Sequence, residues 1–104
     1  MRSEGPLDDG FVGLAHLLAA YFHQDWALDD PDADAVVRRF RRSEVDALVR
    51  RARADVERLL NSSLTDTELE ALFGRLGSSY SPARDGLTAR SWLARVSRLL
   101  ARAG

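Results

Sequence analysis

The sequence contains no cysteine and no lysine, and it has no long run of apolar residues. Without cysteine, disulfide bonds, thiolate catalysis and cysteine-based zinc sites are excluded, and a reducing compartment is favoured. A membrane-spanning helix needs about 20 consecutive apolar residues, so we expect no membrane partner. Residues 1–10 are acidic and carry no apolar run. They predict a flexible segment without a signal peptide, and therefore a cytoplasmic protein.

The groups that catalysis and metal binding require are also scarce. The two histidines, His16 and His23, are seven residues apart, which is not the i, i+4 spacing of a zinc-binding helix. No serine has the G-x-S-x-G setting of a hydrolase nucleophile, and no glycine-rich loop could hold a phosphate. A zinc site at His16, His23 and Asp25, or an acid–base pair of His23 and Asp25, stays an alternative. We favour a protein that is not an enzyme and needs no metal and no cofactor.

The pattern of apolar residues predicts helices and no strands. Within 11–22, four residues follow the i, i+3, i+4, i+7 spacing of an apolar helix face: Leu14, Leu17, Leu18 and Tyr21. We expect Asp30 to cap a short second helix whose first residue is Pro31. Ser43 is expected to cap a third helix with an apolar stripe from Val45 to Leu60.

Two more helices are expected in the second half of the chain. Thr65 and Glu68 have the spacing of a capping box, and Gly77 is a natural helix stop. A loop follows at 77–86, and Thr88 is placed to cap the last helix. A chain of 104 residues buries roughly two-thirds of its unfolded surface in one core. The prediction is an all-α protein, a compact single-domain bundle of about five helices at 11–104.

Charge is unevenly distributed along the chain. Residues 1–35 carry eight acids and one arginine, whereas residues 36–104 carry eight acids and fourteen arginines. Eight of those arginines lie between residues 36 and 59: Arg38, Arg39, Arg41, Arg42, Arg50, Arg51, Arg53 and Arg58. Since arginine binds phosphate, one alternative is a small nucleic-acid-binding module that uses an Arg-rich helix at 38–58. Four interleaved acids (Glu44, Asp46, Asp55 and Glu57) favour a solvated helix face instead.

The stretch AAYFHQDWALDDPDAD, at 19–34, combines aromatic rings with five aspartates and contains no basic residue other than His23. Its aromatic residues are expected in the core and at a corner of the fold. Asp32 and Asp34 suit the first turn of a helix, where the helix dipole favours negative charge. Asp25 and Asp29 have no such local role, which makes them the better candidates for contact with a partner.

Three segments, in this order, resemble a bacterial family. They are YFHQDW at 21–26 with VVRRF at 36–40, LTDTELEALFGRLGSSYSP at 64–82, and DGLTARSWLARV at 85–96. Together they resemble the contact-dependent growth inhibition (CDI) immunity proteins of polymorphic toxin systems, over about 11–100. The resemblance implies an antitoxin that binds the C-terminal toxin domain of a cognate effector. Many such toxins are nucleases, and binding would cover the active or substrate-binding surface.

The charge pattern is compatible with that role. A nuclease needs a positive surface for phosphate, and aspartates on a rigid helical frame can compete for it. We expect a monomer in a 1:1 complex with the toxin and no direct contact with nucleic acid. The expected interface is Asp25, Asp29, Asp32 and Asp34, with Tyr80 and Asp85 as second choices because a loop position would expose Tyr80. The residues expected to be structural are Tyr21, Phe22, Trp26 and Trp92.

Overall fold

The computed structural model describes residues 11–101, so the segment expected to be flexible at 1–10 lies outside the described residues. Within 11–101 the chain is helical and has no strand, which confirms the all-α prediction. The α-helices of this part are α2 (Val12–His16), α3 (Trp26–Asp29), α4 (Ala33–Ser43), α5 (Asp46–Leu60), α6 (Asp66–Arg75) and α7 (Ala89–Ala101). Two further turns are the π-helical η1 (Leu17–Tyr21) and the 3-10 helix η2 (Pro82–Asp85).

The first predicted helix changes type halfway along its length. α2 passes into η1 at Leu17, and the N–H of Phe22 donates to the carbonyl oxygen of Leu17, five residues earlier, at 3.2 Å. The predicted apolar face is nevertheless buried, at Leu14, Leu17, Leu18 and Tyr21. Phe22, which follows Tyr21 directly, is buried as well. The wider π turn thus delivers two consecutive aromatic residues to the core.

Two predicted helix caps are wrong. The cap of α4 is Asp32, whose Oδ1 accepts the N–H of Ala35 at 2.8 Å. Asp30 stands before Pro31 in extended backbone, the conformation that a following proline favours, and it pairs with Arg39 at 2.8 Å. Ser43 ends α4 and does not cap α5, whose preceding residue, Val45, has no side chain that can accept a hydrogen bond.

The predicted start and end of α6 are confirmed. Thr65 Oγ1 accepts the N–H of Glu68 at 3.1 Å, and Glu68 Oε1 accepts the N–H of Thr65 at 2.8 Å. Gly77 follows the helix with φ +103°, in the left-handed region that a residue without Cβ adopts at little cost. The N–H of Ser78 then donates to the carbonyl oxygen of Phe73, which completes a Schellman motif.

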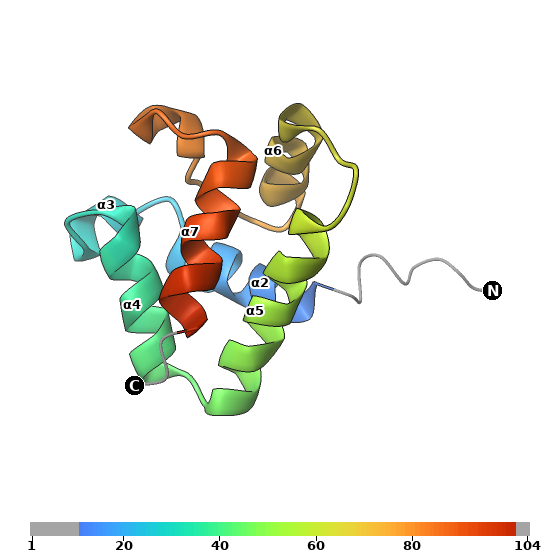
Figure 1. The fold of residues 1–104 in the computed structure, drawn as a ribbon. Coiled ribbons are helices and arrows are strands. Elements are labelled where there is room, and N and C mark those ends of the chain that lie inside the picture. Colours follow the sequence, from blue (N-terminus) through green and yellow to red (C-terminus); the bar gives the residue numbers. More distant parts are fainter. Residues whose placement is uncertain (1–10, 102–104) are drawn as a thin grey trace.

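Helix α7 organises the packing. It contacts α4, α5 and α6 (Figure 1). Helix α5 also packs against α2. As predicted, Thr88 caps α7, because its Oγ1 accepts the N–H of Ser91 at 3.0 Å. In Figure 1, α4 and α7 lie side by side and run in the same direction. None of the helices in the described range has the length and apolar character to cross a membrane.

Helices α2 and α5 come together at a glycine. A Cβ atom on Gly13 would lie 2.4 Å from the backbone nitrogen of Ala52, so only glycine fits at this crossing. Asp55 reaches across from α5, and its Oδ2 accepts the N–H groups of Gly13 and Leu14 at 2.9 and 3.0 Å. The carboxylate supplies the cap that α2 lacks locally, since Phe11 offers none.

The interpretation of Asp55 as part of a solvated helix face is therefore wrong. The residue is only 2% exposed. Burial raises the pKa of the Asp55 carboxyl, and the two N–H donors oppose that rise. Its role depends on a helix that lies more than 40 residues earlier in the chain, which spacing within α5 does not reveal.

Candidate functional site

A cluster of aromatic rings supports one end of the molecule. Tyr80 lies at its centre, with its ring centroid 5.1 Å from that of Phe22, 5.5 Å from that of Trp26 and 5.3 Å from that of Trp92. All four side chains are buried. Aromatic pairs at these separations stabilise beyond the area they bury. The cluster therefore fixes α3, the loop before η2 and the start of α7 relative to one another.

The expected exposure of Tyr80 is wrong, because its side chain is 4% exposed. The loop that carries it folds back onto the core, where the N–H of Ser79 donates to the carbonyl oxygen of Phe22 at 2.8 Å. The Tyr80 hydroxyl donates to Asp85 Oδ2 at 2.8 Å. Burial, reinforced by that carboxylate, raises the pKa of Tyr80, so its hydroxyl keeps its proton and stays a donor.

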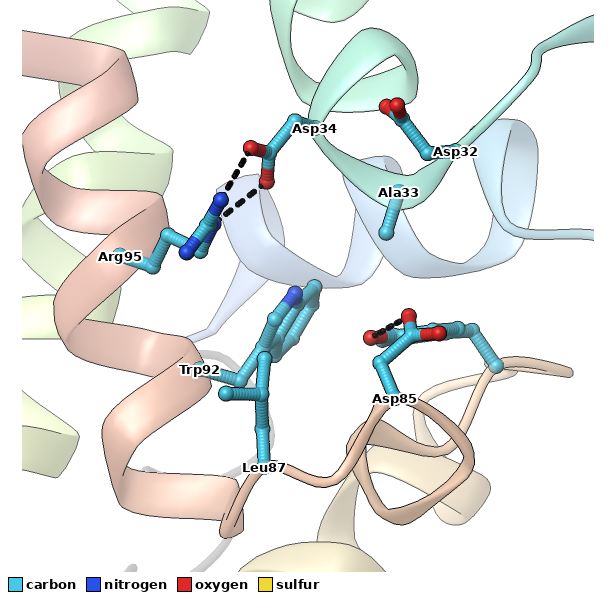
Figure 2. Close-up of a pocket in the computed structure, with 8 residues that line it drawn as sticks. Asp32, Ala33, Asp34, Asp85, Leu87, Trp92 and Arg95 are labelled. Atoms are coloured by element: carbon cyan, nitrogen blue, oxygen red, sulfur yellow. Dashed lines mark hydrogen bonds and ion pairs between the residues drawn. The ribbon is translucent and has the colours of Figure 1, made fainter.

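Four of the six predicted interface residues line one pocket of about 240 Å³. We call it the aspartate pocket, and its lining residues are Asp32, Ala33, Asp34, Tyr80, Asp85, Leu87, Trp92 and Arg95. Figure 2 shows Asp34 on the first turn of α4 paired with Arg95, Trp92 below that pair, and Asp85 on η2 beside Trp92, while the carboxylate of Asp32, at the N-cap of α4, is directed away from Asp85. The packing of α4 against α7 thus brings together carboxylates that are far apart in the sequence.

Each carboxylate of the aspartate pocket is held in place by a hydrogen bond. Arg95 donates to Asp34 through Nε and Nη2, at 2.7 Å each, in the two-pronged geometry that suits a guanidinium. These bonds hold the pKa of Asp34 below its ordinary value. Asp32 caps α4 and Asp85 accepts from Tyr80. The residues that line the pocket thus include three carboxylates and one guanidinium, so negative charge is in excess among them, and Arg38 and Arg98 act on Asp34 from outside the lining.

The other two predicted interface residues, Asp25 and Asp29, lie at α3 and do not line the aspartate pocket. The Asp25 carboxylate is exposed and makes no hydrogen bond or ion pair within residues 11–101. Asp29 lies 3.4 Å from His23 Nε2. Leu28, which lies between Asp25 and Asp29 in the sequence, is 84% exposed. The spacing of apolar residues did not predict this exposed leucine, because α3 is a single turn.

The histidines are not brought together as a metal site. His16 Nε2 lies 3.1 Å from Glu44 Oε2, which also accepts the Tyr21 hydroxyl at 2.7 Å. His23 instead approaches Asp29. Within residues 11–101, no three side chains of the metal-binding types are grouped so that they could hold an ion. The alternative zinc site at His16, His23 and Asp25 is therefore wrong.

The arginines at 38–58 do not form one continuous helix, because Glu44 and Val45 separate α4 from α5. Arg39 is used internally: it pairs with Asp30, and its guanidinium carbon lies 4.9 Å from the centre of the Tyr21 ring. Three other arginines line a second pocket of about 330 Å³, which we call the arginine pocket; its lining residues are Arg38, Arg41, Arg42 and Leu99.

A small helical domain with an aromatic frame and a charged pocket belongs to the class of binding proteins, and comparison with known proteins identifies the family. The model of the CdiI immunity protein family matches residues 10–100, and the chain belongs to this family. This confirms the resemblance to CDI immunity proteins. Members of the family are toxin-binding inhibitors, which also confirms that the protein is not an enzyme.

The fold agrees with that membership. One chain of the crystal structure of the CdiA-CT/CdiI complex from Y. kristensenii 33638 is similar to this chain, with a TM-score of 0.80 and 26% sequence identity. The match covers 88% of this chain and 98% of that one. The curated proteins, by contrast, include no match.

Proposed function

We propose that this CdiI immunity protein neutralises its cognate CdiA-CT toxin domain by seating the aspartate pocket on a cationic surface of the toxin. The observation that carries the proposal is that Asp32, Asp34 and Asp85 line one pocket whose lining contains a single guanidinium, that of Arg95. Asp25 and Asp29 add negative charge at α3, where Arg84, whose guanidinium carbon lies 5.1 Å from the centre of the Trp26 ring, adds one positive charge. The toxin is a nuclease, the complex contains one copy of each partner, and the encounter takes place in the cytoplasm.

The geometry explains how such a surface would inhibit. A nuclease presents arginine and lysine side chains to phosphates. Asp32 and Asp85 keep unused acceptor positions after their internal hydrogen bonds, so each can accept from an incoming cationic side chain. Trp92 and Leu87 supply apolar walls against the stem of that side chain. Occupation of the toxin's cationic groups would then exclude its substrate.

The test is the paired substitution Asp32→Asn and Asp85→Asn. Asparagine is as good a helix cap as aspartate, and its side-chain oxygen can still accept from Tyr80, so the pocket keeps its shape while it loses two charges. We expect association with the purified toxin domain to slow by roughly tenfold at low salt. The dependence of the association rate on salt should also become weaker.

A matched control removes two negative charges elsewhere, with Asp46→Asn and Glu70→Gln, neither of which lines the aspartate pocket. This variant should associate within about threefold of the unmodified protein, since both changed residues lie outside the lining of the pocket and glutamine at position 70 keeps an oxygen that can accept from Ser81. A third variant, Asp25→Asn with Asp29→Asn, measures what α3 contributes. Equal association rates and salt slopes in all variants would show that toxin recognition does not use this surface.

A further inference from the structure

The aspartate pocket and the arginine pocket lie along the same seam. On α4, Asp34, Arg38 and Arg41 are spaced i, i+4, i+7, so they follow one face of the helix. On α7, Trp92, Arg95 and Leu99 are spaced i, i+3, i+7 and likewise share a face. Asp34, Trp92 and Arg95 line the aspartate pocket. Arg38, Arg41 and Leu99, which come later in their helices, line the arginine pocket.

The two pockets are close enough to act on one partner. Seven residues of α-helix separate Asp34 from Arg41, a rise of about 10 Å. Because α4 and α7 run side by side in the same direction, the seam between them carries negative charge where the helices begin and positive charge where they end (Figure 1). We call this surface the bipolar seam.

None of the residues that line the arginine pocket is acidic, although Asp34, four residues before Arg38 on α4, acts on Arg38 electrostatically. Arg38, Arg41 and Arg42 make no hydrogen bond or ion pair within residues 11–101, in contrast to Arg39 and Arg95. Like charges three and four residues apart on a helix repel each other. The helix dipole offsets only part of this repulsion, at the last turn of α4. A carboxylate in the pocket would relieve it and would meet guanidinium groups suited to two-pronged hydrogen bonds.

We propose that the bipolar seam binds a toxin segment that carries both signs of charge, with a basic side chain in the aspartate pocket and an acidic side chain in the arginine pocket. This inference rests on the proposed function and adds a second point of contact to it. Two contacts of opposite sign fix the orientation of the partner. They would also reject a toxin surface that is cationic throughout, which a purely acidic inhibitor would accept.

The proximity of the aspartate pocket argues against nucleic acid as the occupant. Its excess negative charge lies about one Debye length from the arginines at physiological salt, so it would still repel a phosphate backbone that continues along the seam. A protein surface with both signs of charge satisfies both pockets at once. The arginine pocket is therefore assigned to a carboxylate of the toxin.

The experiment compares Arg41→Gln/Arg42→Gln with Arg50→Gln/Arg53→Gln, a control on α5 that also removes two positive charges. Arg42, Arg50 and Arg53 are exposed, and Arg41 is half-buried. If the toxin were simply attracted to negative charge, the loss of two positive charges would strengthen binding in both variants. We expect the opposite for Arg41→Gln/Arg42→Gln, with a loss of toxin affinity of about tenfold or more, mostly through faster dissociation. The control should bind within about threefold of the unmodified protein.

Circular dichroism and thermal melting establish first that both variants fold like the unmodified protein. Unchanged or tighter toxin binding by Arg41→Gln/Arg42→Gln would overturn the inference. A gel shift with a 20-nucleotide single-stranded RNA that depends on Arg41 and Arg42 would overturn it in favour of nucleic acid, and a dimer that needs these arginines would overturn it in favour of self-association. The proposed function is tested separately, by Asp32→Asn/Asp85→Asn.

Discussion

At the residue scale, Asp55 is a buried carboxylate that accepts two backbone N–H groups of another helix. An unpaired buried carboxylate costs several kcal/mol, and a buried N–H group without a partner costs about 1–3 kcal/mol. At the crossing of α2 and α5 both costs are reduced, because Asp55 Oδ2 accepts from the N–H groups of Gly13 and Leu14 and each side supplies the partner that the other needs. The interaction thus joins two helices that are far apart in the sequence.

Removal of the Asp55 side chain should therefore be costly. We expect Asp55→Ala to lower the free energy of unfolding by about 2–4 kcal/mol, since two buried N–H groups lose their acceptor. Asp55→Asn keeps an oxygen at the same position and should cost less than half as much. Urea denaturation of the three proteins measures the difference, and similar losses for both variants would show that charge, and not hydrogen bonding, holds α2 in place.

Asp34 gives a prediction with a defined pH dependence. Hydrogen bonds from Arg95 lower the pKa of Asp34 in the folded state, so the folded protein holds this proton less tightly than the unfolded chain does. The resulting stabilisation is complete above the ordinary carboxyl pKa and is lost as the pH falls through the lowered pKa. Arg95 is partly exposed, and solvent screening limits the effect to about 1 kcal/mol or less.

The measurement compares the unmodified protein with Asp34→Asn by denaturation between pH 7 and pH 3. The difference in the free energy of unfolding should be largest at pH 7 and should shrink towards zero in acid. A difference that stays constant over this range would mean that Asp34 contributes by packing and not through its charge.

The sequence predicted single residues well where their environment is local. The apolar face of Leu14, Leu17 and Leu18 follows from spacing alone and is buried as expected. Tyr80 and Asp55 were misjudged because their neighbours come from distant parts of the chain, such as Phe22 and Gly13. Burial of a polar residue depends on tertiary packing, which periodicity cannot report.

At the scale of helices, replacement of glycine by alanine should have opposite effects at Gly13, which is crowded, and at Gly74, which is not. Gly13→Ala would place a methyl group 2.4 Å from the backbone of α5, which cannot move aside as a flexible side chain can. We expect a loss of about 1–3 kcal/mol or more. Gly74, inside α6, has no atom within 4 Å of the position of a Cβ. Gly74→Ala should therefore stabilise the protein by roughly 0.5–1 kcal/mol, because alanine favours the helix.

Chemical denaturation of both glycine variants tests this pair. A stabilising Gly13→Ala would mean that α2 and α5 cross at a greater distance, and a destabilising Gly74→Ala would mean that α6 is covered by another part of the chain.

The ends of a helix were predicted correctly where the residues that start or stop it lie within a few positions of each other in the sequence. The Thr65–Glu68 box and the stop at Gly77 are complete within a few residues, and both are present. Asp30 was predicted to cap α4, but Asp32 takes that role, because Asp30 stands in extended backbone before Pro31 and pairs with Arg39. The sequence singled out the carboxylates that line the aspartate pocket as interface candidates, but it could not show that they line one pocket, because that depends on the packing of α4 against α7.

At the scale of the whole molecule, the uneven charge along the sequence becomes an uneven charge in space. The acidic first third of the chain ends at the start of α4, and the arginines of the same helix gather at its other end. Charge of this kind does not specify a fold, but it guides association and orientation. The aromatic cluster beneath the aspartate pocket keeps those charges on a rigid support, which reduces the entropy that binding would otherwise cost.

A ligand that binds only the folded state stabilises it, so the melting temperature reports on toxin binding. With free toxin at about 100 times the Kd, the gain is roughly 2.7 kcal/mol, or about 10–20 °C for a domain of this size. Asp32→Asn/Asp85→Asn should melt close to the unmodified protein when alone, because its hydrogen bonds are kept. With toxin present, a tenfold weaker affinity should remove roughly 5–10 °C of the increase.

Differential scanning fluorimetry with the purified toxin domain, read at equal toxin concentrations, makes this comparison. The two melting temperatures separate stability from recognition: a lower value without toxin indicates damage to the fold, whereas a smaller increase with toxin indicates a weaker interface. If the variant and the unmodified protein gain equally from the toxin, the aspartates serve only to cap α4 and to hold Tyr80. The binding surface would then lie on another face of the bundle.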